Sequence, residues 1–112
     1  MSEDLVEKLL KAAVESKQPL SFEYQGLTRQ VCPHMVGRAK DGRIVCHAYQ
    51  YGGQSSKGAV TPDSGGWRFF YLAEIEGVAD GYSLGWYPED LKKSTAEYQP
   101  PSFIVEVLAV AD

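Results

Sequence analysis

The chain has 112 residues, of which 44% are hydrophobic and 23% charged, and its net charge at pH 7 is −4. This length suits one domain with one core, and the composition is that of a globular protein rather than a fibrous or disordered one. No apolar run approaches the length of a membrane span, and no basic start followed by an apolar block opens the chain. We therefore expect a cytoplasmic protein without a membrane partner, whose two cysteines are reduced thiols.

Residues 4–16 are expected to form one amphipathic helix. Leucine, valine and alanine recur there at three- and four-residue spacing. Asp4 and Glu7 match an N-terminal capping box, and Pro19 prevents the helix from continuing. The apolar stripe of this helix needs a surface on which to pack.

Short strands are expected next, within residues 19–80, at 20–25, 27–36, 43–51, 67–72 and 74–78. Pro33 lacks an N–H group and therefore indicates a sheet edge or a bulge in the second strand. Asp41 and Gly42 predict a hairpin turn into the third strand. That strand is apolar enough on both faces to be central in its sheet.

Residues 52–66 contain five glycines and three serines and show no periodicity. We expect a disordered surface loop there. The alternative is a lid, in which Ser55, Ser56 and Lys57 offer hydrogen-bond donors to a bound anion. The C-terminal extension, 81–112, is expected to be irregular, apart from a helical turn near 88–93 and a final strand near 102–110. The whole chain, 1–112, thus predicts a single α+β domain: an N-terminal helix packed on a small, strongly curled antiparallel sheet or barrel of about five or six strands.

Four motifs, in order and spacing, resemble the WYL domain family. They are Tyr24 at a strand end, Arg29-x-x-x-Pro33, Ala48-Tyr49 and Arg68-x-Phe70-x-Leu72-x-x-Ile75. The match covers residues 5–80, while the Trp-Tyr-Leu triplet that names the family is absent. Members usually follow a DNA-binding helix-turn-helix domain, and none precedes residue 5, so the chain resembles a stand-alone, divergent member.

This resemblance implies an SH3- or Sm-like barrel of bacterial type that senses a ligand and regulates transcription. The implied ligand is an anionic small molecule, nucleotide-like, or a single-stranded nucleic acid. The family's ligand-contacting arginines correspond best to Arg29 and Arg68, with His47 and Tyr49 beside them. The predicted ligand-binding residues are Tyr24, Arg29, His34, His47, Tyr49 and Arg68.

The residue pattern itself also favours an anion site. Residues 17–68 hold seven of the eleven basic side chains, including all four arginines, against three of the fifteen acids. Arg29 and Arg68 lie on otherwise apolar strand faces, where an unpaired buried charge is costly, so each must be paired or line a cavity. A guanidinium suits phosphate or carboxylate, and neighbouring aromatic rings suit a base. The alternative is an internal ion pair with Glu23, Glu74 or Glu76.

Two further kinds of site are considered and not predicted. A zinc site at Cys32, His34, Cys46 and His47 is disfavoured because Cys46 and His47 are adjacent and point to opposite faces of a strand, and because no Cys-x-x-Cys spacing is present. No nucleophile-elbow or P-loop pattern accompanies the cysteines. We therefore predict no metal, no cofactor and no enzymatic activity.

The rival prediction from another functional class is a protein–protein interaction module. Its sheet edge, or the aromatic and proline-rich segment 82–101, would hold a partner protein, and the arginines would then be structural. The sequence also leaves a homodimer open.

Overall fold

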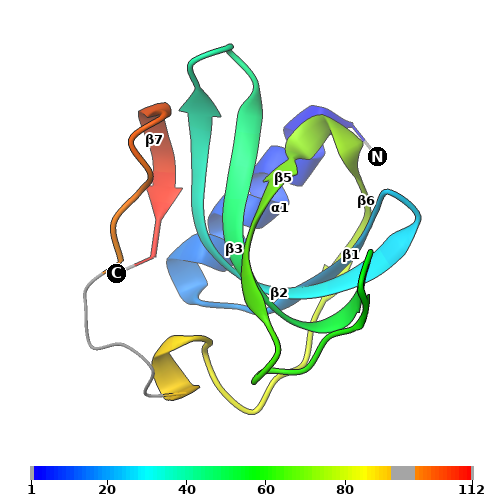
Figure 1. Ribbon diagram of the computed structural model, residues 1–112. Coiled ribbons are helices and arrows are strands. Elements are labelled where there is room, and N and C mark those ends of the chain that lie inside the picture. The colour runs from blue at the N-terminus through cyan, green and yellow to red at the C-terminus, as the bar shows by residue number, and fades with distance from the viewer. Residues whose placement is uncertain (1, 92–97, 112) are drawn as a thin grey trace.

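Seven strands of the described chain form an antiparallel sheet that curls into a half-barrel, and a helix packs on it (Figure 1). The structure is a computed structural model that describes residues 2–91 and 98–111. In chain order the elements are α1 (Glu3–Ser16), β1 (Leu20–Tyr24), β2 (Leu27–Ala39), β3 (Ile44–Ser55), β4 (Gly58–Ala59), β5 (Gly66–Tyr71), the 3-10 helix η1 (Leu72–Glu74), β6 (Ile75–Asp80), the 3-10 helix η2 (Glu89–Leu91) and β7 (Ile104–Val110). The predicted α+β class, with an N-terminal helix on a curled, barrel-like sheet, is confirmed.

The long strands β2 and β3 form the centre of the sheet. The strand order is β4-β3-β2-β1-β6, while β5 pairs with β3 and β7 pairs with β2. The β2–β3 register shifts between Gln30 and Val31 and again between Pro33 and Met35. Such bulges bend a strand and increase its twist. Pro33 therefore lies at a bulge, as its missing N–H predicts, and the bends carry each long strand through two sections of the half-barrel.

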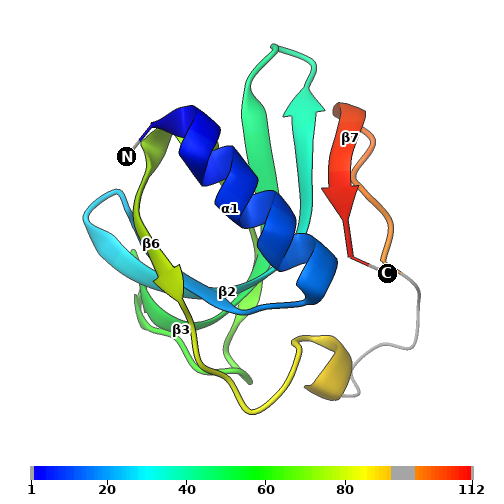
Figure 2. The ribbon, with the colours of Figure 1, turned by 180° about the vertical axis from the view of Figure 1, so that it is seen from behind.

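Helix α1 crosses the back of the half-barrel and closes its core (Figure 2). The helix buries Val6, Leu10, Ala13 and Val14 in the same cluster as the apolar side chains of β1, β2 and β5. Its N-terminus is capped by Ser2, whose Oγ accepts a hydrogen bond from Leu5 N at 3.2 Å. The expected Asp4–Glu7 capping box is not used, because Ser2 lies at the position that supplies the acceptor to the first turn.

The expectation of a disordered loop at 52–66 is wrong in its first half. Strand β3 runs on to Ser55 and forms a tight hairpin with β4. Gly53 has a φ of 77° and Gly58 a φ of 111°, values that glycine adopts readily and other residues do not. The glycines that hide the strand pattern in the sequence are thus the residues that let the chain turn back.

The C-terminal extension packs against the half-barrel in two places: around η2, and along β2, where β7 adds to the sheet. The segment around η2 packs Tyr87 with Cys32, Tyr49 and Tyr51 in a second, smaller buried cluster. η2 is the helical turn expected near 88–93, although residues 92 and 93 lie outside the described chain. Strand β7 confirms the predicted final strand. No helix in the described part of the chain has the length and apolarity to cross a bilayer.

Candidate functional site

The six predicted ligand-binding residues fall into two groups on opposite faces of the sheet. In the β3–β5 ladder, Ala48 lies opposite Arg68 and His47 lies opposite Phe69. Successive strand residues point to opposite faces, so Arg68 shares a face with Ala48, and His47 points the other way. The structure brings together Tyr24, Arg29 and Arg68 in one pocket, and it places His34, His47 and Tyr49 outside that pocket.

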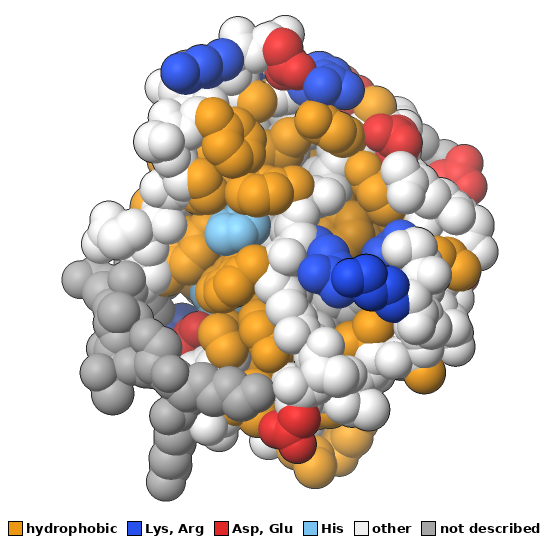
Figure 3. All heavy atoms as spheres, viewed as in Figure 1, with side chains coloured by type: hydrophobic (Ala, Val, Ile, Leu, Met, Phe, Trp, Pro, Cys, Tyr) orange, Lys and Arg blue, Asp and Glu red, His pale blue; other side chains and the backbone are white. Residues whose placement is uncertain are grey.

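This pocket, which we call the seam pocket, lies where the half-barrel is open, between β5 and the β1–β2 hairpin. Its polar lining comes from Gln25, Arg29, Ser55, Ser56, Lys57 and Arg68, and Tyr24, Leu27 and residues 69–71 complete the wall. Its volume of about 620 Å³ is within the range of small-molecule sites. Basic side chains gather in a hollow on this side of the molecule, with apolar surface behind them (Figure 3). None of the lining residues is acidic.

Arg29 is 6% exposed, and its guanidinium is held by groups that carry no negative charge. Its Nη1 donates to Oε1 of Gln50 at 3.2 Å. Its Cζ lies 5.7 Å from the ring centre of Tyr24 and 5.8 Å from that of Phe70, which places the cation over two aromatic faces. Its Nε is buried and has no hydrogen-bond partner among the described residues. Arg29 therefore keeps a positive charge that no carboxylate of the described chain neutralises.

Gln50 fixes the position of Arg29 by means of its own backbone contacts. Gln50 is fully buried, and its Nε2 donates to the carbonyl oxygens of Gly52 at 2.9 Å and Gln54 at 3.0 Å. These two bonds orient the amide so that Oε1 faces Arg29. Gln50 was not among the residues predicted from the sequence. It could have been identified as a polar residue on the strand face that otherwise carries Cys46 and Ala48.

Neither arginine of the seam pocket forms an ion pair with a carboxylate in the described chain. The other two arginines do, in the pairs Arg38–Glu106 at 2.9 Å and Arg43–Asp41 at 2.7 Å. The internal pairs considered above, with Glu23, Glu74 or Glu76, are thus not formed among the described residues. Burial, and next the positive charge of Arg68, lower the pKa of Arg29, as expected where cations share a pocket without an anion.

The β3–β4 hairpin supplies one wall of the seam pocket. Ser55 and Lys57 lie at its tip, where Ser55 Oγ accepts a hydrogen bond from Lys57 N at 3.2 Å. The hairpin lies close to β2, since a Cβ on Gly53 would come within 2.3 Å of Thr28 O. A side chain at position 53 is therefore excluded by the closeness of the two strands. The donors considered for a lid thus lie on a short structured hairpin beside the arginines.

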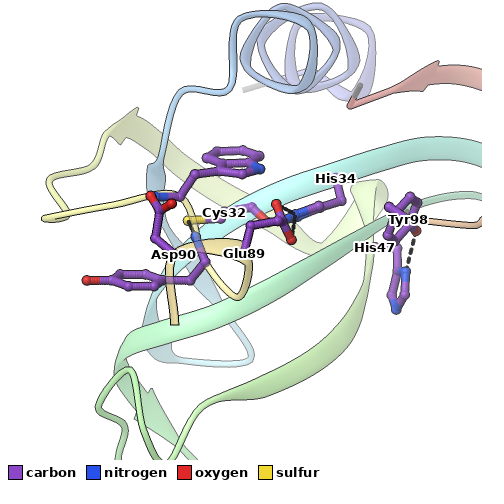
Figure 4. A network of polar contacts seen from close by, with 8 residues as sticks. Cys32, His34, His47, Glu89, Asp90 and Tyr98 are labelled. Atoms are coloured by element: carbon purple, nitrogen blue, oxygen red, sulfur yellow. Dashed lines mark hydrogen bonds and ion pairs between the residues drawn. The ribbon is translucent and has the colours of Figure 1, made fainter. Parts of the chain in front are cut away.

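His34 and His47 belong to an aromatic–histidine cluster, which consists of these two residues with Trp67, Trp86 and Tyr98. Figure 4 shows His34, His47 and Tyr98 of this cluster. His34 is 1% exposed and stacks on Trp86 at 4.8 Å. His47 stacks on Trp67 at 4.6 Å and forms a hydrogen bond through Nδ1 with the Tyr98 hydroxyl. The cluster holds residues from the C-terminal extension against β2, β3 and β5. Its members bind parts of this chain to one another.

Two contacts fix the ring of His34, one to the carbonyl oxygen of Cys32 and one to the carboxylate of Glu89. Its Nδ1 lies 2.8 Å from the carbonyl oxygen of Cys32, which can only accept, so Nδ1 donates. Its Nε2 lies 2.9 Å from a carboxylate oxygen of Glu89. The two contacts hold the His34 ring between β2 and η2. Glu89 was not among the residues predicted from the sequence, and it lies 55 positions away in the chain.

Burial keeps three further side chains, His47 and the two thiols, in their neutral forms at pH 7. Burial, and next the positive charge of His34, lower the pKa of His47 to about 4. Burial raises the pKa of both thiols, Cys32 and Cys46, to about 12. Tyr49 is buried and donates from its hydroxyl to Pro62 O at 3.1 Å. No group of three or more histidine, cysteine or acidic side chains in the described chain is placed to hold a metal ion.

Comparison of the chain with protein-family models, with curated protein sequences and with solved structures finds no match.

Proposed function

We propose that this chain is a WYL-like regulatory domain that binds an anionic ligand in the seam pocket and performs no chemistry on it. The ligand class is a nucleotide-like molecule or a single-stranded nucleic acid. The observation that carries the proposal is Arg29, a buried guanidinium without a carboxylate partner in the described chain, in a pocket that also holds Arg68 and Lys57 and no acid. A buried charge without a counter-ion is costly, so such a site is expected where an incoming anion completes it.

The aromatic lining supports a nucleotide-like ligand over a simple inorganic anion. Tyr24 and Phe70 meet edge to face at 4.9 Å beneath Arg29, so the guanidinium lies on an aromatic surface. Aromatic side chains next to arginines are the usual surface on which a base stacks. The thiols support a role without catalysis, because a cysteine whose pKa is about 12 is not a nucleophile at neutral pH.

The proposal is tested by replacing Arg68 with alanine and measuring the affinity for short single-stranded oligonucleotides and nucleotides at low salt. Arg68 is half-buried and has no ion-pair partner in the described chain, so we expect Arg68→Ala to weaken binding about tenfold or more and to leave the fold intact. Arg38→Ala is the matched control, since Arg38 pairs with Glu106 outside the pocket. Affinity of the unmodified protein should also fall steeply as salt is added.

Two outcomes would refute the proposal. One is that neither nucleotides nor oligonucleotides bind at low salt. The other is that Arg68→Ala unfolds the protein and changes no binding, because Arg68 would then be a structural residue.

A protein–protein interaction module remains the second candidate, and a specific observation favours it. Val105 and Val107 on β7 are 59% and 45% exposed, and Leu84 before η2 is 88% exposed. The aromatic–proline segment itself supports this candidate less, because Tyr87 is buried in the second cluster. Co-purification of one protein, without nucleotide or oligonucleotide binding at low salt, is the result expected from this candidate.

A further inference from the structure

The charge of the seam pocket is larger than one singly charged anion can neutralise. Arg29, Lys57 and Arg68 all line it, and no carboxylate does. Arg29 is 6% exposed, so water screens its charge only weakly. Burial first, and then the positive charge of Arg68, lower the pKa of Arg29, so the second of these causes is repulsion between two cations of the pocket. A ligand that carried a second negative charge would remove more of this repulsion than a ligand with one.

The hydrogen-bonding groups of the seam pocket are chiefly donors. The guanidinium groups of Arg29 and Arg68 line the pocket, and Nη1 of Arg68 donates to the neighbouring Trp67 carbonyl at 3.4 Å. Ser56 adds a hydroxyl group at the hairpin tip, whereas the Ser55 hydroxyl already donates to Gly58 O at 3.4 Å. A phosphate monoester presents three terminal oxygens that only accept hydrogen bonds when it is fully ionised, whereas a phosphodiester presents two. The monoester therefore matches this set of donors better.

We propose that the seam pocket selects a phosphate monoester over a phosphodiester, so that its ligand is a nucleotide or an oligonucleotide end that carries a terminal phosphate. This inference rests on the proposed function and narrows its ligand class. A monoester carries a charge of about −1.5 to −2 at pH 7 because its second pKa is about 6, while a diester carries −1. The terminal phosphate lies among Arg29, Arg68 and Lys57, and the base lies against the apolar lining beside Tyr24.

The test compares two series of compounds that differ in this one property: the four nucleoside 5′-monophosphates and the four corresponding 3′,5′-cyclic monophosphates. Isothermal titration calorimetry at pH 7.5 and low salt should show about tenfold tighter binding for the best monoester than for its cyclic counterpart, because one further charge interacts with the buried cations. At pH 5.5 the monoester becomes largely a monoanion. Its affinity should then approach that of the cyclic compound, whose affinity should not change.

Lys57→Gln tests whether the third cation contributes to this preference. Lys57 lies on the hairpin tip beside the pocket, so its replacement should reduce the monoester-to-cyclic ratio by several-fold while both compounds still bind. Lys40→Gln is the matched control. Lys40 is an exposed lysine on the turn between β2 and β3 and does not line the pocket, so its replacement should leave the ratio unchanged.

The outcomes separate this inference from the proposed function. Equal affinities for the two series, or binding of random-sequence single-stranded oligonucleotides without any mononucleotide, would overturn the monoester preference and leave the anion site standing. If neither series nor the oligonucleotides bind, the proposed function fails and the inference fails with it. A monoester-to-cyclic affinity ratio that does not change between pH 7.5 and pH 5.5 also counts against the monoester preference, because charge would then not be the cause of that preference.

Discussion

At the scale of single residues, the central feature is that a glutamine rather than a glutamate faces Arg29. The Gln50 amide is already committed through its Nε2 to two backbone carbonyls, and its Oε1 offers Arg29 a dipole without a charge. Arg29 is thereby oriented but not neutralised. A carboxylate at the same position would hold the guanidinium equally well and would cancel the charge that an anion needs.

Gln50→Glu should therefore weaken anion binding about tenfold relative to Gln50→Met. Both variants lose the two bonds to Gly52 and Gln54, so both should lower the free energy of unfolding by about 2 kcal/mol. Only the glutamate adds a charge that pairs with Arg29. Urea unfolding and nucleotide titration of the two variants make the comparison. Equal losses of affinity would show that the orientation of Arg29 matters and its neutralisation does not.

His47 makes stability depend on pH in a predictable direction. Its pKa is about 4 in the folded protein because of burial and the charge of His34, against about 6.5 in an unfolded chain. Between these values the unfolded chain binds more protons at this residue than the folded protein does. The stability linked to neutral His47 is thus fully present above about pH 6.5 and is lost as the pH falls towards 4.

We expect His47→Phe to reduce this pH dependence. Phenylalanine keeps the ring stack on Trp67 and Phe69 and cannot take up a proton. The free energy of unfolding, measured in urea from pH 7 to pH 4, should fall less steeply in the variant than in the unmodified protein. Parallel curves would contradict the assignment of the low pKa to His47.

At the scale of elements, the β3–β4 hairpin forms one wall of the seam pocket, next to the walls from β5 and the β1–β2 hairpin. The hairpin carries Ser55, Ser56 and Lys57, and it lies against β2 because Gly53 has no side chain there. The contact is between backbones, so it has little freedom to adjust. Displacement of this hairpin would remove one cation and two hydroxyl groups from the pocket in a single step.

Gly53→Ala should therefore lower ligand affinity as well as stability. The new Cβ would lie 2.3 Å from Thr28 O and would sit on a backbone with a φ of 77°. Gly42→Ala is the matched control, since Gly42 has a φ of 88° with open space around its Cβ position. Both substitutions should lower the free energy of unfolding by about 1 kcal/mol or more through backbone strain. Only Gly53→Ala should weaken nucleotide binding, and a loss of affinity in Gly42→Ala would argue against the hairpin wall.

At the scale of the whole molecule, the sequence predicts the architecture better than the site. Periodicity located α1 and the strands because a half-buried element must alternate its side chains. The β3–β4 hairpin was missed because glycines at positive φ carry no such signal. Arg29 and Arg68 do converge on one pocket, but His47 and Tyr49 lie on the other face. Whether a residue of β3 lies on the same face of the sheet as Arg68 depends on the register between β3 and β5. This register is a long-range property that no local sequence pattern contains.

The distribution of charge over the molecule also bears on the size of the ligand. The chain is acidic overall, with a net charge of −4, yet its seam pocket contains cations alone. The field of an acidic protein repels a long polyanion, whereas a small pocket of opposite sign still attracts one anionic group. This contrast favours a compact ligand or the end of a strand over binding along an extended nucleic acid.

The two cysteines lie in different buried clusters, so the reactivity of each thiol reports on the opening of its own cluster. Cys46 is in the main cluster beneath α1, whereas Cys32 is in the smaller cluster and accepts a hydrogen bond from Tyr87 N at 3.4 Å. A thiol-specific alkylating reagent can reach Cys32 when the segment around η2 lifts away, but it reaches Cys46 only when the helix and the sheet separate. Under native conditions, mass spectrometry should find Cys32 alkylated well before Cys46. Simultaneous alkylation would instead mean that the C-terminal extension and the half-barrel come apart as one cooperative unit.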